Sequence, residues 1–433
     1  MAREKNNTSA WKKIRKLFND IHMWLGLVSG VIVILICFSG TVYVYNTELT
    51  ERAAPHLYKV TPDLSKPPLH PEQGLSIIEK TIEGKVVAMT VPAEPDRTFQ
   101  YTVRKKDEKG RGTTFMLNPY THEITGNSNE KNGTKEFMGK MFSLHRWLLL
   151  DKIEKPIFNG LTNRELGSLI SGWTTILFTL GCLTGLIIWF PRKIKNWKAG
   201  LQIKWGANWK RLNHDLHNTL AFYALIFLLL MGITGPQWSF EWYRTGLQKT
   251  LGTYKPKKQD KPVEGNADKD KISEIQSGKD ATAVTDTVLP VSVFIAKANE
   301  ILPYPGDYNI QFPSESGSAL NINKTRSGFF ASPAADRLSF DAASGEIIKK
   351  EIFADKPLNE RIAGSIKAIH VGNVYGKFSK LLYFIACLIA TSLPITGTII
   401  WLNKLKQKRR RKKSLNKTEE NDYYADEPIV QGI

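Results

Sequence analysis

The chain contains 433 residues, of which 60 are lysine or arginine and 41 are aspartate or glutamate, so its formal net charge at pH 7 is +19. This charge first suggests nucleic acid as a partner. However, the cations are concentrated at 12–16, 192–211 and 404–413, and each cluster lies beside a long apolar segment. That placement argues against nucleic-acid binding and predicts a membrane protein.

Four apolar segments are long enough to cross a bilayer, which requires about 20 residues. They are Leu25–Tyr45, Ser168–Phe190, Leu216–Trp238 and Leu381–Trp401. The first exceeds the 7–15 apolar residues of a cleavable signal peptide, so we interpret it as a retained span. Because lysine and arginine accumulate on the cytoplasmic side, both chain ends (1–24 and 402–433) and the loop 191–215 are expected in the cytoplasm.

The three cysteines all lie within these spans, at Cys37, Cys182 and Cys387. The extracytoplasmic regions therefore have no disulfide framework and no cysteine-rich iron–sulfur or zinc site. We interpret the cysteines as small packing residues.

The two halves of the chain resemble each other, which predicts an internal two-fold repeat. His22 precedes Gly40 by 18 residues, and His217 precedes Gly235 by the same number. The second and fourth spans also end alike, with Thr-Gly followed four residues later by Trp189 or Trp401.

The two extracytoplasmic regions, 46–165 and 239–379, each contain a helix-like stretch followed by alternating strand-like stretches. Turn residues between apolar residues predict hairpins at Leu117–Ile124 and Phe340–Ile347. We therefore expect two small α+β domains outside the membrane. Residues 254–286 and the tail after Ser414 have few large apolar residues and are expected to be flexible.

A histidine stands near the start of each span, and the four form two pairs by repeat and by side. His22 and His217 belong to the cytoplasmic side, and His145 and His370 to the outer side. Imidazoles that face each other in an apolar bundle are axial ligands for haem iron. The sequence thus predicts two b-type haems and an electron path across the membrane.

Several alternatives stay open at these positions. His214 lies three residues before His217 on the same helical face, so it could replace His217 or bond to a haem propionate. The four histidines could instead be polar anchors at the membrane interface. About 13 additional residues, near 150–162, separate His145 from its span, and they are expected to form a re-entrant or surface piece. The pairs Gly26/Gly30 and Gly181/Gly185 favour close helix packing, with clearance for a porphyrin as the second interpretation.

The chain resembles the PepSY-associated transmembrane family. The segments that carry the resemblance are His22–Gly26, Phe38–Gly40, Leu144–Trp147, Thr184–Leu186, Asn213–His217 and Thr234–Gly235. The resemblance implies a membrane α-helical bundle with two periplasmic PepSY-like domains in the bacterial inner membrane. It also implies an iron-regulated protein similar to reductases of ferric siderophores. His122 departs from the glycine that is common in the PepSY turn.

The leading hypothesis is therefore a di-haem reductase that passes electrons from the cytoplasm or the quinone pool to a periplasmic ferric chelate. No dinucleotide or flavin motif is present, so the electron donor must be a separate, unidentified partner. The alternative is a haem-free membrane anchor whose PepSY-like domains bind or regulate peptidases. A transporter is less favoured because the spans hold almost no charged residues.

Overall fold

The computed structural model describes residues 2–63, 65–106, 108, 110–190, 194–256, 289–313, 319–326 and 334–425. Within these residues, four helices are long and apolar enough to cross a membrane: Trp11–Tyr43, Asn163–Trp189, Trp209–Trp238 and Gly376–Arg411. The prediction of four spans is confirmed. Each helix begins before its predicted apolar segment, because hydropathy marks only the apolar part of a helix that polar and aromatic residues also extend.

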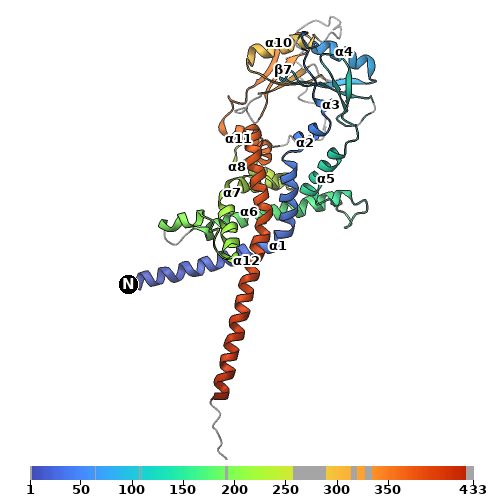
Figure 1. Cartoon of the computed structure of the whole chain (residues 1–433). Helices are drawn as coiled ribbons and strands as arrows, with labels where there is room; N and C mark the ends of the chain where they lie inside the picture. The colour runs from blue at the N-terminus through green and yellow to red at the C-terminus, as the bar shows by residue number, and fades with distance from the viewer. Residues whose placement is uncertain are drawn as a thin grey trace, which may run out of the picture.

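The spans form a four-helix bundle. It consists of α1 (Ala2–Tyr43), α6 (Asn163–Trp189), α7 (Trp209–Thr234) and α12 (Gly376–Ala425). Both α1 and α7 pack against α6 and α12, so the four helices form a ring. Figure 1 shows α12 projecting far beyond the bundle at one end, with a sheet domain at the other. The expectation of a flexible tail is wrong for residues 415–425, which continue the helix.

Side-chain caps define where two of these helices begin. Thr162 accepts a hydrogen bond from the backbone of Glu165, whose carboxylate in turn accepts one from the Thr162 backbone, forming a capping box before α6. The side chain of Asn208 accepts from the backbone N–H of Arg211 at the start of α7. These caps satisfy N–H groups that have no partner within the helix.

The strands of the two long loops form one eight-stranded antiparallel sheet in the order β4-β3-β2-β1-β5-β6-β7-β8. The strands are β1 (Lys85–Val91), β2 (Phe99–Arg104), β3 (Thr113–Leu117), β4 (Ile124–Asn127), β5 (Gly306–Gln311), β6 (Ala319–Arg326), β7 (Asp336–Asp341) and β8 (Ile347–Glu351). The order is mirrored about the β1–β5 pair, with one half of the sheet coming from each loop.

This sheet corrects the expectation of two separate domains. β1 and β5 pair from Ala88↔Gln311 to Val91↔Tyr308, which joins the halves. As edges of two separate sheets, both strands would expose unpaired backbone groups, and pairing them removes both edges. One continuous core, which includes Ile78, Tyr101 and Phe294, then lies between the sheet and helices α4 (Pro71–Thr81) and α10 (Val291–Ile301).

Shorter helices connect the sheet to the bundle. They are α2 (Asn46–Ala53), α3 (Pro55–Tyr58), α5 (Gly133–Trp147), η1 (Leu150–Lys152), η3 (Pro236–Trp238), α8 (Glu241–Thr250) and α11 (Leu358–Val371). A further short helix, η2 (Ile194–Leu201), lies between α6 and α7 at the opposite end of the bundle. In Figure 1, α4 and α10 cover the face of the sheet that is turned away from the bundle, while α5 and α11 lie between sheet and bundle. Of the predicted insertion 254–286, residues 257–286 lie outside the described part of the chain.

Both predicted hairpins are confirmed, and their turns have the same construction. Asn118 and Asp341 each accept two backbone N–H bonds through a side-chain oxygen. Four residues later, His122 has φ 64° and Gly345 has φ 66°. This left-handed conformation strains any residue with a Cβ, whereas glycine adopts it freely.

Replacing His122 with glycine is expected to raise the thermal stability of the sheet domain by up to about 1 kcal/mol, because relief of strain exceeds the entropy that glycine adds to the unfolded chain. Replacing Gly345 with alanine should lower it by about 1–2 kcal/mol. Thermal unfolding of the two detergent-solubilised variants measures the difference. A lower melting temperature for His122→Gly would contradict the strain argument.

Candidate functional site

The structure brings the four histidines together as two pairs at opposite ends of the bundle. His22 on α1 and His217 on α7 have ring centroids 6.3 Å apart. His145 on α5 and His370 on α11 have ring centroids 6.2 Å apart. We call the first the tail-side pair, because it lies at the end from which α12 projects, and the second the sheet-side pair.

Both spacings fit two imidazoles that ligate one metal from opposite sides. A ligating nitrogen lies about 2 Å from its metal, and the ring centroid lies roughly 1 Å behind that nitrogen, so the two centroids should be roughly 6 Å apart. The interplanar angles of 80° and 65° show that the rings are not stacked on each other. Each pair therefore has the ring spacing that two imidazoles on one metal require.

Neither pair of histidines comes from two helices that are neighbours in the ring. His22 and His217 lie across the bundle, on α1 and α7. His145 and His370 lie in the last turns of α5 and α11, which are not membrane spans. The sheet-side pair thus depends on two helices that cap the end of the bundle.

Each imidazole rests against a glycine on a neighbouring helix. A Cβ added to that glycine would lie 3.1–3.5 Å from the Cε1 atom of the ring. The contacts are His22 with Gly185, His217 with Gly397, His145 with Gly40, and His370 with Gly235. A Cβ at Gly40, Gly185 or Gly397 would be closer to the ring than an ordinary contact, whereas a Cβ at Gly235 would be in ordinary contact with it.

The threonine before three of the four glycines contacts the Nδ1 atom of the same histidine. Nδ1 of His217 lies 2.8 Å from Thr396 Oγ1, and Nδ1 of His370 lies 2.9 Å from Thr234 Oγ1. His22 Nδ1 lies 3.0 Å from the carbonyl oxygen of Gly181 and 3.1 Å from Thr184 Oγ1.

His145 differs from the other three in this detail. Its Nδ1 lies 2.9 Å from the Ile36 carbonyl oxygen, and the Ser39 hydroxyl donates instead to the carbonyls of Leu35 and Ile36. As with His22, the carbonyl that contacts Nδ1 belongs to the residue four positions before the glycine that the ring contacts.

These partners determine the tautomer of the imidazoles. The hydroxyls of Thr184, Thr234 and Thr396 donate their own protons to helix carbonyls, so their oxygens can only accept from the ring. Carbonyl oxygens can likewise only accept. Nδ1 must therefore carry the proton, which leaves the lone pair of Nε2 free to ligate a metal.

The sheet-side imidazoles are neutral. Burial lowers the pKa of His145 and lowers the pKa of His370 to about 3, so neither ring is protonated at neutral pH. Trp238 contacts His370 edge-on with ring centroids 4.8 Å apart, and its carbonyl oxygen accepts a bond from Arg146. A neutral imidazole is the form that binds a metal.

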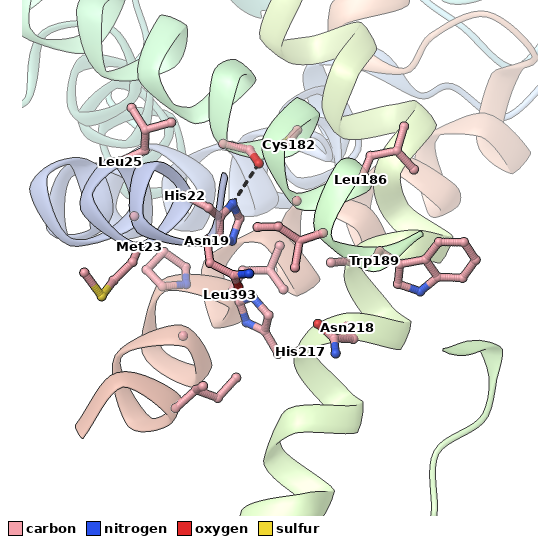
Figure 2. Close-up of a pocket in the computed structure, with 18 of the residues that line it drawn as sticks. Asn19, His22, Met23, Leu25, Cys182, Leu186, Trp189, His217, Asn218 and Leu393 are labelled. Atoms are coloured by element: carbon pink, nitrogen blue, oxygen red, sulfur yellow. Dashed lines mark hydrogen bonds between the residues drawn. The ribbon is translucent and has the colours of Figure 1, made fainter. Parts of the chain in front are cut away.

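A cavity of about 580 Å³ contains the tail-side pair. This volume lies within the roughly 300–1,000 Å³ that is typical of cofactor sites. Figure 2 shows His22 and His217 within it, together with the apolar side chains of Leu25, Leu186 and Leu393.

The glycines and cations of this cavity are also informative. Gly26 and Gly181 line it, and a Cβ on either would meet no atom within 4 Å, so both leave open space. Three cations, Arg15, Arg211 and Lys404, also line the cavity. Gly26 and Gly181 therefore do not make the close helix contact expected of them, whereas Gly30 packs against Pro394.

The structure separates His214 from the tail-side pair. Its half-exposed ring lies beside Asn218 and 3.7 Å from an Asp215 carboxylate oxygen, at the lining of the cavity. His217, and not His214, faces His22. The remaining histidines, His56, His70 and His122, are exposed in the sheet domain.

The additional residues after His145 form a surface loop that packs through η1 against α5 and α6. Leu148 and Leu149 both have positive φ values, 56° and 62°, and they turn the chain sharply at the end of α5. The buried side chain of Asn163 then closes the loop, because it bonds to the backbone of Ile153, Lys155 and Ile157 at 2.8 Å each.

A family model of the PepSY-associated transmembrane region matches residues 20–404. The chain belongs to this family. The match spans all four paired histidines and the four glycines against which they rest. A comparison with curated proteins finds no match to the chain.

In the sequence, the Ser/Thr-Gly dipeptides are visible only as marks of a repeat, and their position beside the histidines is not. The four dipeptides that hold these glycines could not be singled out by number, because Ser29-Gly30 and Ser171-Gly172 lie in the same spans. The dipeptides are Ser39-Gly40, Thr184-Gly185, Thr234-Gly235 and Thr396-Gly397. Which dipeptide receives which histidine depends on helix packing.

Proposed function

We propose that the protein is a di-haem membrane oxidoreductase that carries electrons from one side of the membrane to the other. The observation that carries this proposal is the pair of facing histidines at each end of the bundle, with centroids 6.2–6.3 Å apart and Nδ1 bonded in every ring. One such pair could be an accident of packing. Two pairs with the same supporting contacts favour a repeated site.

The ligand set favours haem over a bare metal ion. Within the parts of the chain that the structure describes, no group of three or more His, Cys, Asp or Glu side chains gathers as metal ligands. Two imidazoles are too few for a bare zinc ion, whereas a haem iron takes four nitrogens from its porphyrin and needs only two axial ligands. Bound haem would supply reversible one-electron transfer.

The chain's own residues would hold and orient such a group. His22 and His217 would ligate one haem, and Gly26 and Gly181 would leave space for a flat ring beside them. Arg15, Arg211 and Lys404 could pair with the propionates. His145 and His370 would ligate the second haem, next to Trp238 and Arg146.

The direction of transfer follows from the charge distribution. The cations at 404–413 favour a cytoplasmic location for the tail side, and the sheet domain then lies outside. We infer a bacterial inner-membrane protein that takes electrons from a cytoplasmic or quinol donor at the tail-side pair. The substrate at the sheet side is a ferric chelate such as a siderophore complex, whose hard oxygen ligands hold ferrous iron less well.

We also infer that the two halves are an internal repeat with one PepSY-like unit each. The mirrored strand order and the two matching turns support this.

The visible spectrum of the purified protein tests the proposal. Protein produced with ample haem supply is expected to show a b-type spectrum with two haems per chain, and its reduced form should be reoxidised by a ferric chelate. Protein that contains no haem under these conditions would sink the proposal and favour the haem-free peptidase-binding module.

The bond between Thr396 and His217 is expected to tune the affinity of the tail-side haem. Thr396→Val should weaken binding by about tenfold, the low end of the range for such supporting contacts, because the Leu393 carbonyl remains as a partner for the ring. Haem titration of the apoprotein measures the change. Ser39→Ala is the matched control, since the Ser39 hydroxyl bonds to helix carbonyls, and it should leave both affinities unchanged.

A further inference from the structure

The same number of residues separates the two histidine pairs on two different helices. On α1, His22 belongs to the tail-side pair, and Gly40, 18 residues later, is the contact of His145 in the sheet-side pair. On α7, His217 and Gly235 repeat this relation with His370. Each helix therefore extends from one pair to the other with the same number of residues.

This distance nearly equals the thickness of the membrane. Eighteen helical residues rise about 27 Å, and an average helix tilt of about 20° reduces the height to about 25 Å. The hydrocarbon core of a bilayer is about 30 Å thick. The two pairs thus lie close to opposite faces of the insulating layer.

The space between the pairs is largely apolar, and its helix segments carry no charged side chain. Ala224, Leu228, Ala386 and Ala390 are each no more than 3% exposed and form a buried cluster. The stretches 23–39, 167–184, 218–234 and 381–396 contain no Asp, Glu, Lys or Arg. Charge that moves between the pairs therefore meets no Asp, Glu, Lys or Arg side chain in these stretches that would compensate it.

We propose that electron transfer between the two pairs is electrogenic, so that the membrane potential sets how an electron divides between them. The inference rests on the proposed di-haem function. In the step, the iron at the tail-side pair loses one electron and the iron at the sheet-side pair gains it, and no proton crosses. One negative charge moves outward through most of the dielectric, so an inside-negative potential drives the transfer.

The expected effect is large. A potential across the full core changes a one-electron equilibrium tenfold for every 59 mV or so. About five-sixths of the core lies between the pairs, so roughly 100 mV should change the ratio of the two reduced haems by about 20- to 30-fold. A pair of sites at the same depth would show no change.

The test uses the full chain with both haems in sealed vesicles, sorted by a tag on the cytoplasmic tail so that one orientation remains. Each protein receives about one electron, the reductant is removed, and valinomycin with a potassium gradient sets the potential. Difference spectra should show the electron moving to the sheet-side haem when the tail side is negative, and moving back when the gradient is reversed. The control is His370→Ala with a single haem, whose spectrum should not respond.

The outcomes separate this inference from the proposed function. Two haems whose reduced ratio stays constant under both polarities would overturn the electrogenic step and leave the di-haem function standing. Protein without haem would overturn both.

Discussion

A chain in which His217 is replaced by alanine is expected to bind one haem in place of two. The substitution removes one of the two ring nitrogens that would ligate iron at the tail-side pair. The ring of His22, whose centroid lies 6.3 Å from that of His217, then has no imidazole opposite it. His145 and His370 are at the other end of the bundle, so the sheet-side haem should remain. The haem-to-chain ratio and the loss of one component from the reduced spectrum measure the result. Electron flow across the membrane should stop.

The matched control is His214→Ala on the same helix. His214 lines the same cavity and lies three residues away, but it faces Asp215 and Asn218 instead of His22. This variant should keep both haems. If His214→Ala loses a haem while His217→Ala keeps both, the assignment of ligands at the tail-side pair is wrong.

Replacing Gly40 with valine should remove the sheet-side haem without changing either of its histidines. A Cβ at this position would lie 3.1 Å from Cε1 and 3.2 Å from Nδ1 of His145, and the two methyl groups of valine extend further. The ring must move, and a displaced imidazole no longer faces His370. Spectra and haem-to-chain ratios again provide the measurement.

The reciprocal variant, Gly185→Val, serves as the control. Its Cβ would lie 3.1 Å from Cε1 of His22, so it should remove the tail-side haem and spare the other. Each variant thus serves as the other's control for general damage to the fold, because both place valine at a glycine within a membrane helix. Loss of both haems in either variant would contradict the independence of the two sites.

Sequence alone determined the membrane architecture, and the physical reason is local. A span needs an unbroken apolar segment, so all four spans could be predicted without knowledge of packing. The two hairpin turns are similar, because Asn118 and Asp341 form their turns with residues two and three positions away. Pairing of histidines by repeat was also accessible, since His22 and His217 share the same distance to a glycine.

Tertiary structure alone decided three other features. The fusion of both loops into one sheet depends on β1 meeting β5, which are more than 200 residues apart, and an unpaired edge leaves no distinct sequence pattern. The choice of His217 over His214 depends on which side of α7 faces α1.

The role of Gly40 and Gly235 was also hidden in the sequence. Their equal spacing from His22 and His217 was visible as a repeat, but its meaning required the rings of His145 and His370 to be seen against them. Contacts between helices depend on their relative height and rotation, and these are set by packing across the whole bundle. The 18-residue spacing was therefore visible in the sequence, but only the fold shows that it separates the two histidine pairs.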